Sequence, residues 1–189
     1  MLKAIRAGAM TLVMTVGGVV TAGHVGVAVR LRSGAVLTLP ADAISAGEYN
    51  RVDLGAAGRV YKSKSSAVPL IVIYELDRKG KTCKELVAEM WTTVQQQAKS
   101  TAPADKALTR VDKIEKRSVR GALALYSETA NRAPSDVVAH RPFHAAASYL
   151  ICSDSDYFNL IVSADDPILP GAARQEIDAL VATLSIPAK

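Results

Sequence analysis

The sequence contains few aromatic residues and only two cysteines. Its 189 residues include one Trp, two Phe and six Tyr, so any core must be built mainly from Val, Leu, Ile and Ala. Hydrophobic residues make up 49% of the chain and charged residues 22%, a balance that excludes wholesale disorder. At this length we expect a single domain.

A concentrated basic patch is also missing. The formal net charge is +5, but Lys and Arg alternate with acidic residues, as in the run from Arg110 to Arg120. Proteins that bind nucleic acids usually gather Lys and Arg on one face or one helix. We therefore interpret this run as a solvated surface and expect no nucleic-acid partner, while a weak preference for anionic surfaces stays open.

Charged residues are absent from positions 7–29, directly after Lys3 and Arg6. A positive start, an apolar stretch and small residues near its end are typical of a secretory signal peptide. Val20-Thr21-Ala22 is a suitable cleavage site. We therefore expect residues 1–22 to be removed and the protein to be periplasmic or secreted.

Two other interpretations of this segment stay open. The apolar stretch, continued to about residue 29, is long enough to cross a bilayer, which needs roughly 20 residues, and could remain as an uncleaved anchor. Four glycines and His24 dilute it, however. Alternatively, Val25 to Leu31 could form the first strand of the folded domain. We expect membrane association only if the N-terminal segment is retained; no cysteine follows it closely, which argues against a lipoprotein anchor.

The two cysteines, Cys83 and Cys152, are a candidate disulfide. An even count in an oxidising compartment favours pairing. The bond would close a loop of about 70 residues and could stabilise the fold by about 4 kcal/mol through chain entropy. The alternative is two unpaired thiols, one at a helix start and one buried in a strand.

Hydrophobic periodicity predicts an antiparallel sheet with two helices, an α/β (α+β) fold. Thr82 and Glu85 form a capping-box pattern that predicts the start of the first helix. Leu86, Val87 and Met90 follow on one face of that helix. The expected strands are Gly34 to Pro40, Gly58 to Lys62, Val68 to Leu76, Leu108 to Lys116, Val119 to Glu128, Phe143 to Cys152 and Tyr157 to Ser163, and a closing helix is expected from about Gly171 to Leu184.

These elements, in this order, resemble the PsbP/Mog1-like family of small exported bacterial proteins. The resemblance rests on Gly34–Pro40, Leu70–Tyr74, the helix from Thr82, Val119–Ala124, the hairpin Ser148–Leu160 and the end of the last helix at Leu184-Ser185-Ile186. It implies a single domain over residues 34–186 with a central antiparallel sheet flanked by helices, an α-β-α sandwich. It also implies a binding or assembly role, although no photosystem- or Ran-binding residue of the family can be matched to this chain.

The loop from Asn131 to Pro142 and its continuation contain the only weak candidates for a ligand site. His140 and His144 are four residues apart, which would align two metal ligands on a helix, but Pro142 between them makes a helix there improbable. Arg141 could help bind an anion if the histidines were protonated. An ordinary surface loop is the simpler interpretation.

Other motifs are better explained by structure. Asp154 and Asp156 are typical of a hairpin turn, and the full calcium-loop pattern is missing. Cys83 near a helix start could be a nucleophile, but no base is placed beside it by the sequence. We therefore expect no catalytic, cofactor-binding or metal-binding residue and no cofactor.

The sequence leads to one functional hypothesis and one alternative. The hypothesis is a non-catalytic exported protein that binds a protein or a cell-envelope component. The alternative is a small-ligand or metal-binding protein, or a hydrolytic enzyme, that uses the loop from His140 to His144.

Overall fold

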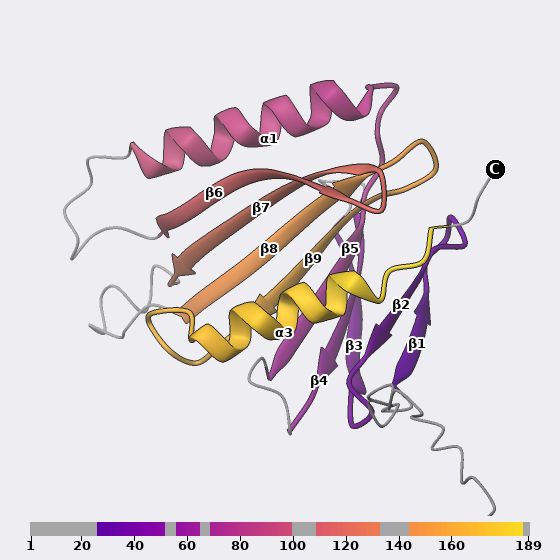
Figure 1. Cartoon of the computed structure of the whole chain (residues 1–189), viewed down its shortest axis with the longest axis vertical. Helices are drawn as coiled ribbons and strands as arrows, with labels where there is room; N and C mark the ends of the chain where they lie inside the picture. The colour runs from indigo at the N-terminus through magenta and orange to yellow at the C-terminus, as the bar shows by residue number, and fades with distance from the viewer. Residues whose placement is uncertain (1–25, 52–55, 65–68, 100–108, 133–143, 187–189) are drawn as a thin grey trace, which may run out of the picture.

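The computed structural model describes residues 26–51, 56–64, 69–99, 109–132 and 144–186. These residues form a seven-stranded antiparallel sheet, a separate two-stranded hairpin and two helices (Figure 1). The strand order in the sheet is β3-β4-β5-β9-β8-β7-β6. The strands are β3 (Ile44–Arg51), β4 (Ala56–Lys62), β5 (Leu70–Glu75), β6 (Thr109–Val119), β7 (Ala122–Asn131), β8 (His144–Cys152) and β9 (Tyr157–Ser163).

The middle of the sheet is the most apolar part of the described residues. β5, which the sequence predicts as its most hydrophobic strand, pairs with β9 although the two are far apart in the sequence. Ile71 and Ile73 on β5, and Leu160 and Val162 on β9, are completely buried. Because central strands are covered on both faces and edge strands are not, this order puts the continuous apolar runs at the centre and charged strands at the edges.

Helix α1 (Cys83–Ala98) covers one face of the sheet. Its N-terminus has the predicted capping box: the Glu85 N–H donates to Thr82 Oγ1, and Glu85 accepts from the Thr82 N–H at 2.7 Å. Leu86 and Val87 pack against Leu125 and Leu150 from β7 and β8. This smaller core lies under α1 alone and does not reach β3 or β4.

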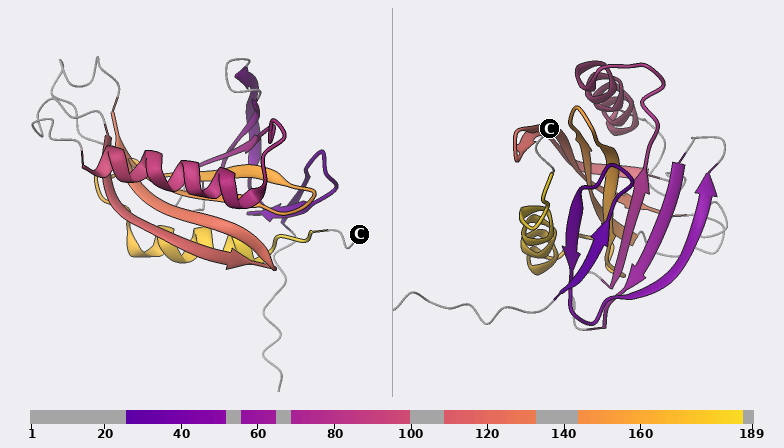
Figure 2. Two further views of the ribbon diagram at one scale, coloured as in Figure 1. Left: turned by 90° about the horizontal axis from the view of Figure 1, so that it is seen from above. Right: turned by 90° about the vertical axis from the view of Figure 1, so that its right-hand side faces the viewer.

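Helix α3 (Gly171–Ala182) lies on the opposite face of the β6–β9 part of the sheet (Figure 2). Its Ala173 and Ile177 are completely buried in the main core. The hairpin of β1 (Val27–Arg30) and β2 (Val36–Leu39) adds to this core from the side. Val36 exchanges two backbone hydrogen bonds with Ser185, so the segment after α3 is tied to the hairpin.

The fold class expected from the sequence is confirmed, with two local corrections. Strand β3 was not expected, because Ser45, Ala46 and Gly47 break the apolar alternation that identifies strands. The turn between β6 and β7 is at Arg120 and Gly121, both with positive φ of 50° and 80°, so Val119 ends β6 and does not begin β7. β1 matches the strand interpretation of Val25 to Leu31, whereas residues 1–25, and with them the expected signal peptide, lie outside the described residues.

The predicted disulfide is confirmed. Cys83 and Cys152 are bonded with a Cα–Cα distance of 5.4 Å across a sequence separation of 69 residues. The bond joins the first residue of α1 to the last residue of β8. Within the described ranges, no helix is both long and apolar enough to cross a membrane.

Removing this bond should destabilise the protein by about 2–4 kcal/mol, because a covalent link across a long loop restricts the unfolded chain. Replacing both cysteines, Cys83→Ser with Cys152→Ser, should therefore lower the midpoint of urea unfolding. The reduced wild-type protein is the control and should unfold at the same urea concentration as the double variant. Equal stability of the oxidised and reduced wild type would contradict the prediction.

Candidate functional site

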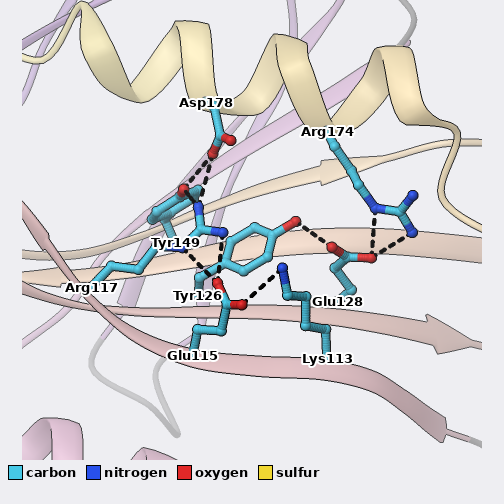
Figure 3. Close-up of polar contacts among 8 residues, drawn as sticks. All are labelled: Lys113, Glu115, Arg117, Tyr126, Glu128, Tyr149, Arg174 and Asp178. Atoms are coloured by element: carbon cyan, nitrogen blue, oxygen red, sulfur yellow. Dashed lines mark hydrogen bonds and ion pairs between the residues drawn. The ribbon is translucent and has the colours of Figure 1, made fainter.

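The largest network of polar side chains among the described residues lies between α3 and the part of the sheet formed by β6, β7 and β8 (Figure 3). We call it the α3 polar cluster. It combines two tyrosines with three basic and three acidic side chains. Its members are Lys113, Glu115, Arg117, Tyr126, Glu128, Tyr149, Arg174 and Asp178.

The register of the sheet brings these residues together. Glu115, Tyr126 and Tyr149 are cross-strand neighbours in one row of β6, β7 and β8, and Lys113 is paired with Glu128 in the next row. All of them point to the α3 face because side chains alternate along a strand. From the other side, Arg174 and Asp178 are one helical turn apart, so both face the sheet from α3.

Arg117 is the centre of one half of the cluster. Its guanidinium carbon lies 4.0 Å from the centre of the Tyr126 ring, a cation–π arrangement. The same guanidinium donates to Glu115 at 2.7 Å and to Asp178 at 3.0 Å. It also donates to the hydroxyl of Tyr149, which in turn donates to Asp178. One arginine thus connects β6, β7, β8 and α3.

Glu128 is the centre of the other half. Its side chain is only 4% exposed, and it accepts from the Tyr126 hydroxyl at 2.8 Å and from Arg174 at 2.9 and 2.7 Å. Burial disfavours the charged carboxylate, but the hydrogen bonds from Arg174 and Tyr126 outweigh it and hold the pKa of Glu128 below its usual value. The carboxylate is therefore ionised, and each of its two oxygens accepts a hydrogen bond.

The two tyrosines act as donors. Burial, followed by the hydrogen bonds to Glu128 and Asp178, raises the pKa of Tyr126 and of Tyr149. Hydrogen bonds from Lys113 and Arg117 lower the pKa of Glu115. Each of these shifts moves a group away from neutral pH, so none of these four groups is suited to act as a general acid or base near pH 7.

A second feature is a groove beside the β1–β2 hairpin. It consists of two adjoining clefts of about 480 and 270 Å³ that share Leu31, Arg32 and Glu75. Glu75 accepts from Arg59 at 2.7 Å and from the Arg32 N–H at 2.6 Å, and Arg59 also donates to the Arg30 carbonyl. We call the two clefts together the hairpin groove.

Of the weak ligand candidates His140, Arg141 and His144, the structure describes only His144, which lines neither feature, whereas Asp156 of the β8–β9 turn lines the smaller cleft of the hairpin groove. His140 and Arg141 lie outside the described residues, and His144 is exposed at the start of β8, opposite Asn131. Asp156 is buried in the β8–β9 turn, where Ser33, Ser153 and Ser155 donate to its carboxylate. Among the described residues, no group of three His, Cys, Asp or Glu side chains is arranged to hold a metal ion.

Sequence reasoning missed the α3 polar cluster. The alternating charges predict a solvated run from Arg110 to Arg120, but the side chain of Arg117 is only 28% exposed and stacks on a buried tyrosine. Two local signals pointed to it: Tyr126 and Glu128 share one face of an otherwise apolar strand, and Arg174 and Asp178 share one face of a helix. The link between those two patterns is not local and appears only in the fold.

Comparison with known proteins supports the fold. The chain is similar to the solution structure of cyanobacterial PsbP (CyanoP) from Synechocystis sp. PCC 6803, with a TM-score of 0.54 and 10% identity over 91% of this chain and 99% of that one. It is also similar to a crystal structure from Bacteroides thetaiotaomicron VPI-5482, with a TM-score of 0.51 and 11% identity. That match covers 87% of this chain but spans only half of the Bacteroides chain.

The fold is therefore PsbP-like, as the sequence resemblance implied. At such low identity, the likeness applies to the fold alone. No protein-family model matches the chain. No curated protein matches it at a significant level either.

The buried carboxylate gives a pH prediction. Because the pKa of Glu128 is lower in the folded than in the unfolded state, its contribution to stability is present above the unfolded pKa, about 4.3, and is lost as the pH falls through the folded value. Glu128→Gln should cost about 1–3 kcal/mol at pH 7. The difference from wild type should shrink in acid.

Chemical denaturation at a series of pH values measures this difference. The exposed Glu48→Gln is the matched control and should change the free energy of unfolding little at any pH. A cost of Glu128→Gln that is the same at neutral and at acid pH would show that ionised Glu128 is not what stabilises the fold.

Proposed function

We propose that this PsbP-like chain is exported and acts as a non-catalytic binding or assembly protein whose partner is a protein or a cell-envelope component. Two observations support export. The Cys83–Cys152 disulfide is of the kind that persists in oxidising compartments. The charge-free segment after Lys3 and Arg6 has the pattern of a signal peptide.

The observation that carries the non-catalytic part is the internal neutralisation of the α3 polar cluster. General acids and bases work best when their pKa lies near the operating pH. Here the carboxylates of Glu115 and Glu128 are shifted down and the hydroxyls of Tyr126 and Tyr149 are shifted up. The α3 polar cluster therefore supports a structural role, in which it holds α3 on the sheet, and not a catalytic one.

The hairpin groove is the surface that we propose for the partner. Arg30 and Arg32 are exposed on its rim, and among the described residues neither side chain has an ion pair. Small-molecule sites are mostly apolar with a few polar groups, whereas the larger cleft of this groove is open and five of its eight lining residues are charged. Exposed arginines at a rim that make no ion pair with another described residue suit acidic side chains on a protein partner.

Reversing the charge of both arginines should abolish partner binding. The experiment is native mass spectrometry of the protein gently extracted from its own cell envelope, comparing wild type with Arg30→Glu/Arg32→Glu. The matched control is Lys62→Glu/Lys64→Glu, which makes the same charge change on two exposed residues at the far end of β4. We expect a second protein on wild type and control, and at least about tenfold less of it on the groove variant.

Two outcomes count against the proposal in different ways. Equal retention of the partner by the groove variant would show that the hairpin groove is not the binding surface. A bound small molecule or metal in place of a protein, lost on replacing His140 and His144 by Ala, would contradict the binding-protein function itself.

A further inference from the structure

The two-stranded hairpin has one covered and one uncovered edge within the described residues. On the β2 side, Val36 exchanges backbone hydrogen bonds with Ser185. The Thr38 N–H donates to Thr183 Oγ1 at 2.9 Å on the same side. On the β1 side, no other strand is paired with Val27–Arg30 in the part of the chain that the structure describes. An unpaired strand edge presents N–H and C=O groups that a further strand can join.

The register of the hairpin shows which backbone groups of β1 point outward. In an antiparallel pair, residues that bond across the pair alternate with residues whose N–H and C=O point away from it. Val36 and Thr38 bond outward from β2. Their partners in the register, Arg30 and Ala28, therefore point their backbone groups outward from β1. The Arg30 carbonyl accepts from Arg59 at 3.0 Å, which agrees with this direction. The Ala28 N–H and C=O and the Arg30 N–H thus face the uncovered edge.

This edge borders the hairpin groove. The larger cleft, of about 480 Å³, is lined by Arg30 at the end of β1 and by Glu48 of β3. Ala57 and Gly58 of β4 also line it, and both are small residues that leave space beside the hairpin. A strand added to β1 lies about 4.8 Å from it. The cleft is therefore placed where a third strand of the hairpin would run.

The charges beside the edge favour an acidic occupant. Arg30 and Arg32 are exposed on the rim, and neither side chain makes an ion pair with another described residue. Glu75 is neutralised by Arg59 at 2.7 Å. Glu48 is thus the one acidic residue of the larger cleft without an ion pair to another described residue, and the two rim arginines outnumber it. Opposite charges on directly opposed residues stabilise a strand pair.

We infer that the hairpin groove binds an extended, acidic segment of a protein partner, which adds to β1 as an antiparallel third strand of the hairpin. This inference rests on the binding function proposed above and specifies how the partner is held. The outward N–H and C=O groups of Ala28 and the N–H of Arg30 supply the backbone hydrogen bonds, as in other cases where a peptide joins a sheet edge. Antiparallel addition is the more stable pairing.

The geometry also predicts the sequence pattern of the bound segment. Val29 is buried and Arg30 is exposed, so the two faces of β1 differ. Directly opposite residues of paired strands have their side chains on the same face of the sheet. Acidic residues at every second position of the segment therefore lie on the face of Arg30, and their own N–H groups point at β1. The residues between them face the floor of the groove, with their N–H groups pointing away.

The test uses a probe peptide in which backbone and charge are varied separately. A synthetic peptide of alternating Glu and Val residues forms a strand with one acidic and one apolar face. Fluorescence anisotropy measures its dissociation constant with the purified protein. Methylation of the Glu backbone nitrogens should weaken binding at least about tenfold, whereas methylation of the Val nitrogens, the matched control, should not. A peptide with Lys in place of Glu should also bind at least about tenfold more weakly.

A proline in β1 tests the same hydrogen bonds from the protein side. The Ala28 N–H is not used within the hairpin, so Ala28→Pro should keep the β1–β2 pairing and remove one outward donor. Ala28→Thr keeps the N–H and is the control. We expect about tenfold weaker peptide binding by Ala28→Pro and wild-type binding by Ala28→Thr. Circular dichroism checks that both are folded; if Ala28→Pro is not, the two methylated peptides decide the question on the wild type.

Four results would overturn the inference. The first is a wild-type protein that does not bind the Glu–Val peptide up to about 1 mM. The second is equal binding of the two methylated peptides, and the third is a folded Ala28→Pro variant that binds the peptide as tightly as wild type. The last is a wild-type dimer that Ala28→Pro dissociates in analytical ultracentrifugation, because the occupant of the edge would then be a second copy of this chain.

Native mass spectrometry separates this inference from the proposed function. Loss of the partner from both Arg30→Glu/Arg32→Glu and Ala28→Pro supports strand addition in the groove. Loss from the arginine variant alone, with Ala28→Pro folded, contradicts strand addition while the groove remains the binding surface.

Discussion

The buried carboxylate of Glu128 constrains how helix α3 packs on the sheet. Glu128 lies on an otherwise apolar face of β7 and is 4% exposed. An ionised carboxylate cannot be taken out of water unless other groups replace its hydration. Arg174 from α3 and the hydroxyl of Tyr126 are those groups, so the helix has to lie where its arginine reaches the strand. The main core forms around that arrangement.

The two helices are attached to the sheet by different means. α1 is joined to β8 by the disulfide and packs over a small separate core. α3 packs over the main core and is oriented by two ion-pair centres, at Arg174 and at Asp178. Because Arg117 connects Asp178 to Glu115, the same network also orders the charged edge strand β6. The α3 polar cluster thus positions α3 and orders the side chains of Glu115 and Arg117 on β6. The hairpin groove shares no residue with this cluster.

Local patterns predicted most of the fold but little of the candidate site. The capping box of Thr82 and Glu85 and the alternation of Phe158, Leu160 and Val162 each involve residues close in the sequence, and the structure confirms both. β3 was missed because its small and polar residues give no apolar period. The α3 polar cluster was missed because Arg117, Tyr149 and Asp178 meet only through strand register and helix placement, which no short window of sequence contains. The hairpin groove likewise depends on a long-range contact, because the end of β1 and the turn after it lie beside Arg59 of β4 and Glu75 of β5.

Buried Glu128 fixes α3 on the sheet, and amide hydrogen exchange tests this role most directly. Exchange would be followed residue by residue in wild type and in Glu128→Gln under conditions where both are folded. We expect faster exchange for the amides of α3 and unchanged protection for those of α1, which has its own core and the disulfide. Unchanged protection in α3, or equal loss of protection in both helices, would contradict it.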